Sequence, residues 1–430
     1  MLPFAKARPT TARLSSGLSA VAIPLSTLHS VAVSIRLRIG PRYERHESNG
    51  ISHFLEHMLY RGTARYPSAN AQAAAFERLG SSLAAATYVD HGMLGVVVPP
   101  ENLRKVLTLL GEVYQEPLLG EIEIERGIVE EEILDLLDDD NNPIDTDVLC
   151  RGLVFGDHAL GMPITGSIER LREFDRRKLR RHHARHYTGA GTVLAIAGPI
   201  DAERALAAVS DSFAGLPRGE LLAAAPPPPQ LEPRFFYRDR SDSKTALRLA
   251  FRAPGDGHPD EPAVELLLRT LDDGMSTRLY EHICDERGLC YDVSANYESY
   301  ADQGLFDIAA ETAHHRAGRV LDELFAVVRR LRDDGPSEAE LAKAKTRLRW
   351  SLTEVLDHPA EVADFHALAL LTQGPRTLLQ RFEQLADVTR AQVRSAAEHM
   401  FRASNLSAVA VGELPRRIER ALERRVKSFS

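Results

Sequence analysis

Alternating apolar and polar positions mark the first predicted strands. Val31, Val33, Ile35, Leu37 and Ile39 alternate with Ala32, Ser34, Arg36 and Arg38. This period of two predicts a strand over Ser30 to Ile39, because successive side chains of a strand point to opposite faces. Another strand is predicted over Ala12 to Pro24. Helical patterns come later, and Ser337 with Glu340 forms a capping box that predicts the start of one helix.

The chain repeats itself across a proline-rich segment, AAAPPPP, at Ala223 to Pro229. The segment LRRHHARHYTGAGTVLAIAG (Leu179 to Gly198) aligns without gaps on VRSAAEHMFRASNLSAVAVG (Val393 to Gly412), at an offset of 214 residues. Each copy predicts a helix, a turn and an apolar strand. A chance similarity between two helix-strand pairs is the alternative interpretation.

Further segments match in the same order. Val31 to Ile39 corresponds to Ala246 to Phe251, and the long helix after Pro100 corresponds to Ala317 to Leu331. The preserved order favours a duplication, and alternating strands and long helices predict an α+β fold with mixed sheets. The predicted parts are an N-terminal half, a proline-rich linker and a C-terminal homologous half, at residues 1–222, 223–233 and 234–430.

Composition indicates a soluble globular protein of two to four compact units. The chain has 430 residues, of which 44% are apolar and 27% are charged. A net charge of -8 argues against a protein that binds nucleic acid or an anionic membrane. Three cysteines without a CxxC pair argue against a disulfide framework or a thiolate zinc site.

The sequence also predicts where the protein works. No apolar run reaches membrane-spanning length. The start carries Lys6, Arg8 and Arg13, which faintly resembles an organelle-targeting peptide. Only about ten residues precede the first predicted strand, however, which is short for a targeting segment. We therefore expect a cytoplasmic protein.

The most concentrated chemistry lies in SHFLEHMLYRGT, Ser52 to Thr63. On a helix, for which Asn49 is a plausible cap, His53 and His57 project from one face and can bind one Zn²⁺. Glu56 lies beside that face, where it can reach a water molecule at the metal. The order is His-x-x-Glu-His, and a helix with two solvated histidines is the alternative.

A catalytic zinc needs a third protein ligand, which we expect on a separate helix. The segment EIEIERGIVEEEILDLLDDD, Glu121 to Asp140, offers Glu125 and Glu132. They are seven residues apart, which is two helical turns, so they share a face. Taken alone, such a charged helix is usually a solvated surface.

These residues resemble the pitrilysin/insulinase family of inverted-motif zinc peptidases, which includes insulin-degrading enzyme, the mitochondrial processing peptidase and single-length bacterial members. The family motif continues with a glutamate ligand about 75 residues after the second histidine and another glutamate seven residues before that ligand. Here Glu132 follows His57 by 75 residues, and Glu125 precedes Glu132 by seven. The segment Arg278 to Tyr297 resembles the family segment that ends in Gly-Leu-x-Tyr.

The resemblance implies a role for each residue. His53, His57 and Glu132 would be the metal ligands for one Zn²⁺ per chain, and no second motif occurs near Glu261 to Leu271. The other implied catalytic residues are Glu56 as general base, Glu125 as a carboxylate that supports the site, and Tyr291 as the hydroxyl that stabilises the tetrahedral intermediate. A tyrosine packed in the core is the alternative for Tyr291.

Two positions depart from the family pattern. Cys284 stands where the family usually has an arginine, and Arg287 is a possible substitute one helical turn later. Ala84 stands where the family usually has an asparagine in the substrate-binding strand. Both departures weaken the expected contacts to the backbone of a substrate and leave the metal ligands intact.

The resemblance implies two halves that face each other as a clamshell, and an endopeptidase acting on short or unfolded peptides. Peptides would bind by strand addition to a sheet edge such as Ser82 to Tyr88. The chain would pair as a homodimer or with a related chain. The alternative is a weakly active or partner-dependent peptide-binding subunit of a two-chain peptidase. A purely structural metal site is disfavoured, because such sites usually have four protein ligands.

Overall fold

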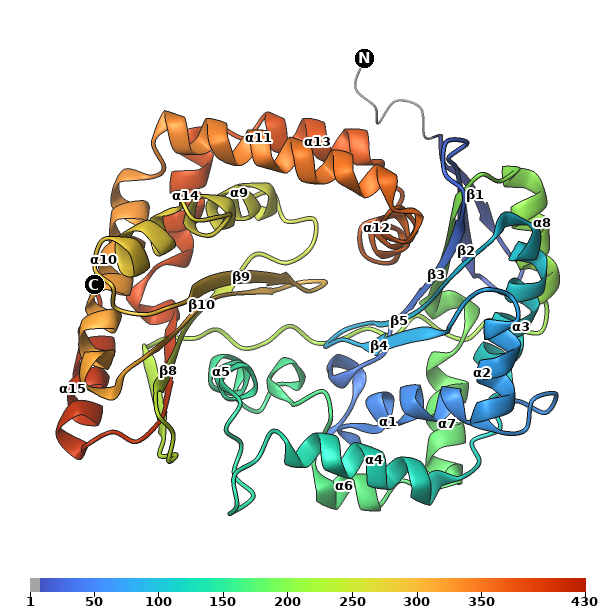
Figure 1. Ribbon diagram of the computed structural model, residues 1–430, viewed down its shortest axis with the longest axis horizontal. Coiled ribbons are helices and arrows are strands. Elements are labelled where there is room, and N and C mark those ends of the chain that lie inside the picture. The colour runs from blue at the N-terminus through green and yellow to red at the C-terminus, as the bar shows by residue number, and fades with distance from the viewer. Residues whose placement is uncertain (1–7) are drawn as a thin grey trace. The chain divides into compact units, whose positions relative to one another are not determined.

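The computed structural model describes residues 8–430, so Lys6 of the basic start lies outside the described residues (Figure 1). The fold is mixed α/β with two sheets, as predicted. The chain forms two compact units, each assembled from three stretches of sequence. Unit 1 contains the residues up to Ile133 together with Pro163–Ala225 and Ser351–Arg381, and unit 2 contains Leu134–Met162, Pro226–Trp350 and Phe382–Ser430.

The sheet of unit 1 has six strands, in the order β1-β2-β6-β3-β5-β4. Strands β2 and β6 are parallel, and the other pairs are antiparallel. Because β4 pairs with β5 alone, it is an edge strand. The strands are β1 (Thr10–Arg13), β2 (Ser19–Pro24), β3 (Val31–Leu37), β4 (Ala84–Thr87), β5 (Gly92–Val98) and β6 (Thr192–Gly198).

The sheet of unit 2 has five strands, in the order β7-β11-β8-β10-β9. Its pairs run parallel, antiparallel, antiparallel and antiparallel, like those from β2 to β4 in the other sheet. This shared order supports a duplication, while the exact limits of the homologous halves stay a prediction. The strands are β7 (Arg234–Arg238), β8 (Thr245–Ala253), β9 (Val293–Ser299), β10 (Gly304–Thr312) and β11 (Leu406–Val411).

Helices cover both sheets. Those of the first half are α1 (Ile51–Met58), α2 (Ala69–Glu77), α3 (Leu103–Gln115), α4 (Ile122–Leu134), α5 (Thr146–Phe155), α6 (Ile168–Arg172), α7 (Arg176–His186) and α8 (Ala202–Ser212). Those of the second half are α9 (Glu261–Leu271), a π-helix (Tyr280–Asp285), α10 (Ala317–Asp334), α11 (Glu338–Glu354), α12 (Pro359–Thr372), α13 (Leu378–Ala386), α14 (Arg390–Met400) and α15 (Arg416–Lys427). The predicted capping box of Ser337 and Glu340 is confirmed at the start of α11.

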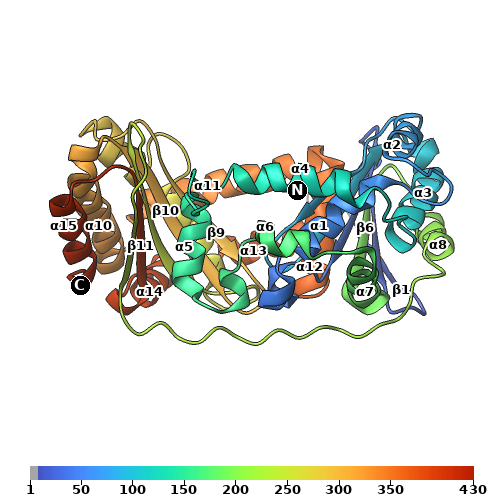
Figure 2. The same cartoon turned by 90° about the horizontal axis from the view of Figure 1, so that it is seen from below.

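Each sheet is covered on one face by a helix from the other half of the sequence. In unit 1, α12 packs on β3 and β6 on the face opposite α3 and α8 (Figure 1). In unit 2, α5 packs on β8 and β11, and α10 and α15 lie on the other side of that sheet (Figure 2). Val362, Ala363 and Ala367 of α12 join one buried apolar cluster with residues of β2, β3 and β6.

Strand β3 is buried on both faces, although its sequence alternates. Arg36 is 4% exposed, and its guanidinium donates to the Asp364 carboxylate of α12 at 2.5 to 2.8 Å. Ser34 also donates to Asp364, at 3.0 Å. The polar positions of β3 therefore face a helix rather than solvent, and the ion pair anchors α12 on the sheet.

Two local predictions need correction or a limit. The single strand predicted over Ala12 to Pro24 is a hairpin of β1 and β2, because the chain turns at Gly17, which has φ 90°. Among residues 8–430, no helix is both long and apolar enough to cross a membrane.

Candidate metal centre

Helix α1 presents the His-x-x-Glu-His motif by burying its opposite face. Ile51, Phe54, Leu55 and Met58 are almost completely buried. The predicted cap at Asn49 is wrong, since Gly50 occupies the cap position and has no side chain to accept a hydrogen bond. Asn49 instead donates to Glu44 and to the Pro163 carbonyl.

The carboxylate of Glu44 takes over the capping role at the start of α1. It accepts hydrogen bonds from the backbone N–H groups of Gly50 and Ser52, each at 2.8 Å. These donors would otherwise be unpaired at the helix start. Burial raises the pKa of Glu44, although its hydrogen bonds with Ser52 and Gly50 oppose that shift. Gly50 is needed here because a Cβ atom would lie 2.6 Å from the Thr165 carbonyl oxygen.

Three predicted ligands converge beyond α1. Nε2 of His53 lies 3.4 Å from Oε1 of Glu132, and Nε2 of His57 lies 3.4 Å from Oε2 of the same carboxylate. One potential ligand atom from each residue lies within 4.8 Å of the others. Tetrahedral ligands about 2.1 Å from zinc are roughly 3.4 Å apart, so the spacing fits one zinc ion. Two imidazoles and a carboxylate are also a donor set that zinc accepts.

Glu125 lies in the first turn of α4, two helical turns before Glu132. It is 5% exposed, and its Oε1 lies 2.8 Å from Nδ1 of His57. Arg61, four residues after His57, donates to its other oxygen. Burial raises the pKa of Glu125, but the hydrogen bonds from His57 and Arg61 outweigh burial and lower it. Within the described residues, Nδ1 of His53 is buried without a hydrogen-bond partner.

The charges of the site reinforce one another. Hydrogen bonds from His53 and His57 hold the pKa of Glu132 well below its usual range. Burial alone would lower the pKa of His57, but hydrogen bonds to Glu125 and Glu132 raise it to about 9. The site thus attracts positive charge, either as a proton or as a cation.

Glu56 connects the motif with the edge strand. Its Oε2 accepts a hydrogen bond from the Thr87 hydroxyl of β4 at 3.2 Å. Tyr60 lies near both elements, because it is close to the Glu56 charge and has a hydrogen bond with the backbone of Ala85. Burial and the Glu56 charge raise the pKa of Tyr60 to about 12, and the hydrogen bond with Ala85 opposes this shift. The candidate base therefore lies at the end of a strand whose outer edge is unpaired in the described sheet.

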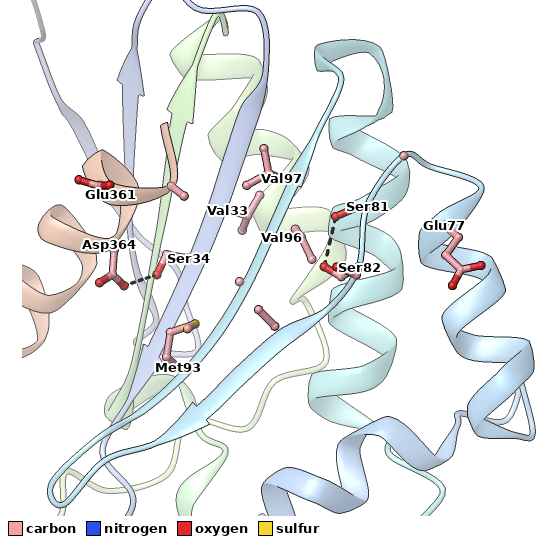
Figure 3. Close-up of a pocket in the computed structure, with 14 residues that line it drawn as sticks. Val33, Ser34, Glu77, Ser81, Ser82, Met93, Val96, Val97, Glu361 and Asp364 are labelled. Atoms are coloured by element: carbon pink, nitrogen blue, oxygen red, sulfur yellow. Dashed lines mark hydrogen bonds between the residues drawn. The ribbon is translucent and has the colours of Figure 1, made fainter. Parts of the chain in front are cut away.

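The opposite face of this strand borders a pocket of about 740 Å³ (Figure 3). Its lining is largely apolar, and it includes Ala84, Met93, Gly95, Val97 and Ala360, with Ser34 pointing toward Asp364 at one side. Val97 is 39% exposed although it lies in a strand next to the edge. Ala84, the departure from the asparagine pattern, is part of this lining.

The remaining predicted residues lie in unit 2. Tyr291 is 92% exposed, between the π-helix and β9. Arg287 was the possible substitute for the family arginine that Cys284 replaces. Its guanidinium contacts Glu286 at 2.5 Å and Glu323 at 3.2 Å, so it is already paired with two carboxylates. Cys284 itself lies beside Cys290, with 3.7 Å between the sulfur atoms.

Sequence reasoning missed several residues that support the site. Arg61 and Thr87 hold Glu125 and Glu56, and Glu44 caps α1. The spacing of four residues between His57 and Arg61 was a usable signal, because such pairs lie on one helical face. Glu44 and Thr87 gave no such signal, since their contacts depend on loops and on strand pairing.

Comparison of the sequence with known proteins identifies the family of this chain. Residues 20–149 match the model for the Insulinase family (Peptidase family M16), and residues 173–348 match the Peptidase M16 inactive domain. An uncharacterized zinc protease of Rickettsia felis is 30% identical over 343 residues, which cover 79% of this chain and 82% of the relative. An uncharacterized zinc protease of Mycobacterium tuberculosis is 29% identical over 409 residues, covering 93% and 92%.

A solved structure gives the same result for the fold. A protease from Helicobacter pylori superposes with a TM-score of 0.87 at 21% sequence identity, covering 94% of this chain and 99% of that one. The match to the inactive domain, residues 173–348, includes helix α9 (Glu261–Leu271), which lacks the His-x-x-Glu-His order. The chain belongs to the insulinase family of peptidases, peptidase family M16.

Proposed function

We propose that this protein is a zinc metalloendopeptidase that hydrolyses short or unfolded peptides, with one Zn²⁺ per chain. The observation that carries the proposal is the convergence of His53, His57 and Glu132 within 4.8 Å of one another, next to Glu56. Three protein ligands leave a fourth position open, as in catalytic rather than structural zinc sites. Relatives named zinc proteases support the same metal.

A bound zinc ion would supply a Lewis acid and lower the pKa of a water molecule in the open position. Glu56 accepts the proton of the attacking water and later passes it to the leaving amine. The Thr87 hydroxyl holds one Glu56 oxygen, which leaves the other oxygen for this transfer. Glu125 orients His57 through Nδ1, so that Nε2 faces Glu132.

The edge of β4 offers a place for the peptide backbone. A strand added there would lie beside Thr87 and therefore beside Glu56. Thr87 reaches Glu56 of α1, whereas Ala84 borders the pocket that residues of α12 also line. By strand alternation, Ala85 shares the face of Thr87 and Ala86 shares the face of Ala84. Alternate side chains of an added peptide would thus point toward the metal and toward the apolar pocket (Figure 3). This arrangement favours extended peptides over folded substrates.

A peptide assay tests the proposal directly. The purified chain is incubated with an internally quenched peptide library, with and without a chelator, and with zinc restored. We expect cleavage that the chelator abolishes and zinc restores. Cleavage that persists in chelator after metal analysis shows zinc to be absent would contradict a zinc-dependent mechanism.

A second candidate is a weakly active or partner-dependent subunit. Ala84 and Cys284 replace the asparagine and arginine expected to hold the substrate backbone, and residues 173–348 match an inactive domain. On this alternative, the chain binds peptide but cleaves it only beside a related chain. Homodimer or heterodimer formation and a cytoplasmic location remain part of the proposal.

Adding a related chain separates the two candidates. The isolated chain and a mixture with a related M16 chain are compared in the same peptide assay, and light scattering gives their mass. If Glu56→Gln in this chain abolishes the activity of the mixture, the site here does the chemistry. If Glu56→Gln leaves the mixture fully active, this chain acts as the binding subunit.

A further inference from the structure

Two cysteines of unit 2 lie within reach of each other. The sulfur atoms of Cys284 and Cys290 are 3.7 Å apart, and both side chains are partly accessible to solvent. The third cysteine, Cys150, is completely buried elsewhere in the unit. A disulfide needs sulfur atoms about 2 Å apart, a change that small side-chain rotations can supply.

The backbone brings the pair together through a defined turn. After the π-helix, Gly288 adopts φ 57° and its N–H donates to the Cys284 carbonyl at 2.9 Å. The N–H of Leu289 donates to the Ile283 carbonyl at 3.0 Å, and the Leu289 side chain is buried. This closure of a helix end by a left-handed glycine directs Cys290 back onto Cys284.

We propose that Cys284 and Cys290 form a reversible disulfide when the protein meets a peroxide, and that this bond restrains Tyr291. One cysteine sulfur attacks a peroxide oxygen, the O–O bond breaks, and a sulfenic acid forms while water leaves. The second sulfur then displaces hydroxide from the sulfenic acid, and the hydroxide takes up the remaining thiol proton as water. Two thiols are oxidised by two electrons, and hydrogen peroxide is reduced to two water molecules.

The bond would act on the next residue in the chain. Tyr291 follows Cys290 directly and is almost fully exposed, whereas Val293 is buried at the start of β9. With the thiols free, Leu289 and Val293 hold the two ends of this short segment, Leu289 through the hydrogen bond that the Thr312 hydroxyl of β10 donates to its carbonyl at 2.7 Å, and Cys290 between them has no covalent bond to the π-helix. A disulfide would fix the Cys290 side to the π-helix as well, which narrows the positions that the Tyr291 hydroxyl can reach. This effect on peptide hydrolysis rests on the proposed function.

Mass spectrometry tests the bond without any need for activity. The reduced, zinc-loaded full-length chain is treated with hydrogen peroxide, alkylated and digested with trypsin. Cleavage after Arg287 separates the cysteines, so the disulfide should link peptides Leu279–Arg287 and Gly288–Arg316. We expect this linked pair, its loss after reduction, and its absence in Cys284→Ser and Cys290→Ser. Burial raises the pKa of both thiols, Cys290 to about 12, so a long incubation is appropriate.

The chemical test has clear contrary results. Oxidation of either cysteine to a sulfinic acid without a linked pair would overturn the proposal, as would a link to Cys150. Hydrogen exchange of residues 288–293 should slow on oxidation in the parent chain and stay unchanged in Cys290→Ser. Unchanged exchange in a chain that carries the disulfide would show that Tyr291 is not restrained.

Kinetics tests the link to function. We expect peroxide to lower kcat/KM several-fold in the parent chain, reductant to restore it, and Cys284→Ser to be indifferent to peroxide. In Tyr291→Phe, oxidation should cause no further loss. An equal loss in that variant would mean that the disulfide acts elsewhere. If no chain cleaves peptides, the proposed function fails while the linked-peptide and exchange results still decide the disulfide.

Discussion

The carboxylate of Glu125 lies 2.8 Å from Nδ1 of His57. This contact fixes which ring nitrogen is available on the other side, because an imidazole that donates from Nδ1 presents Nε2 as a lone pair. Nε2 is the atom that faces Glu132. The relationship therefore orients one candidate ligand before any metal arrives.

Loss of this orientation should weaken metal binding without abolishing it. Glu125→Gln should lower zinc affinity about 10- to 100-fold, the usual effect of removing a carboxylate that holds a ligating histidine. Competition with a fluorescent chelator measures the change. The exposed Glu131→Gln, on the same helix, is the matched control. Equal affinities in the two variants would contradict the assigned role of Glu125.

Metal content should depend on three residues. We expect about one Zn²⁺ per chain, lost in His53→Ala, His57→Ala and Glu132→Ala, because each removes one of three protein ligands. Elemental analysis after dialysis measures it, with the exposed His315→Ala as a control. Full zinc occupancy in His57→Ala would show that the ligand assignment is wrong.

The base should be separable from the ligands. Glu56→Gln should retain zinc but lower peptide hydrolysis on the order of a hundredfold or more, since a positioned proton acceptor contributes that much. Parallel metal analysis and kinetics distinguish the roles. Zinc loss in this variant would make Glu56 a ligand, and an unchanged rate would remove it from the reaction.

The second half should contribute through Tyr291. If Tyr291 has the role that the family resemblance implies, Tyr291→Phe should lower kcat on the order of a hundredfold with zinc unchanged, because the change removes a donor to the developing oxyanion. Cys284→Arg should raise kcat/KM by restoring a guanidinium for the substrate backbone. Steady-state kinetics on both variants, with thermal unfolding as a check on folding, tests these effects. Activity that is indifferent to Tyr291 would exclude it from catalysis.

Acid should destabilise the helix that covers the first sheet. Burial lowers the pKa of His366 in α12 to about 4, below its ordinary value near 6.5. Between these two pKa values the folded state binds fewer protons than the unfolded state. The stability that neutral His366 contributes is therefore fully present above pH 6.5 and is lost as the pH falls to 4, a loss in the free energy of unfolding of about 3 kcal/mol at most. Thermal unfolding at pH 7.5 and pH 5 should show a smaller acid shift in His366→Gln than in His315→Gln. Equal shifts would contradict this origin.

Much of the candidate site could be predicted because its signals are local. The spacing of His53 and His57 places both on one face of a helix, and the spacing of Glu125 and Glu132 does the same on another. The cap at Asn49 could not be predicted correctly, since Glu44 reaches the helix start through a loop whose path depends on Gly50.

Contacts between segments that lie far apart in the sequence could not be predicted from local patterns. The alternation in β3 predicts a strand but does not reveal that Arg36 pairs with Asp364, which lies 328 residues further along the chain. An arginine on a strand gives no sign of such a partner. The hairpin at Gly17 was missed although Ser15, Ser16 and Gly17, which are residues typical of a turn, separate Leu14 from Leu18.

The origin of α12 has a consequence for how the protein can be divided and how it evolved. A fragment that ends at Ala225 keeps the strands of the first sheet but lacks Val362, Ala363 and Ala367, which complete its apolar cluster. Cut there, the two pieces should aggregate when produced separately and become soluble when co-expressed, because each carries the helix that covers the other's sheet. Such reciprocal exchange is the geometry expected if two identical copies had swapped these helices before their genes fused.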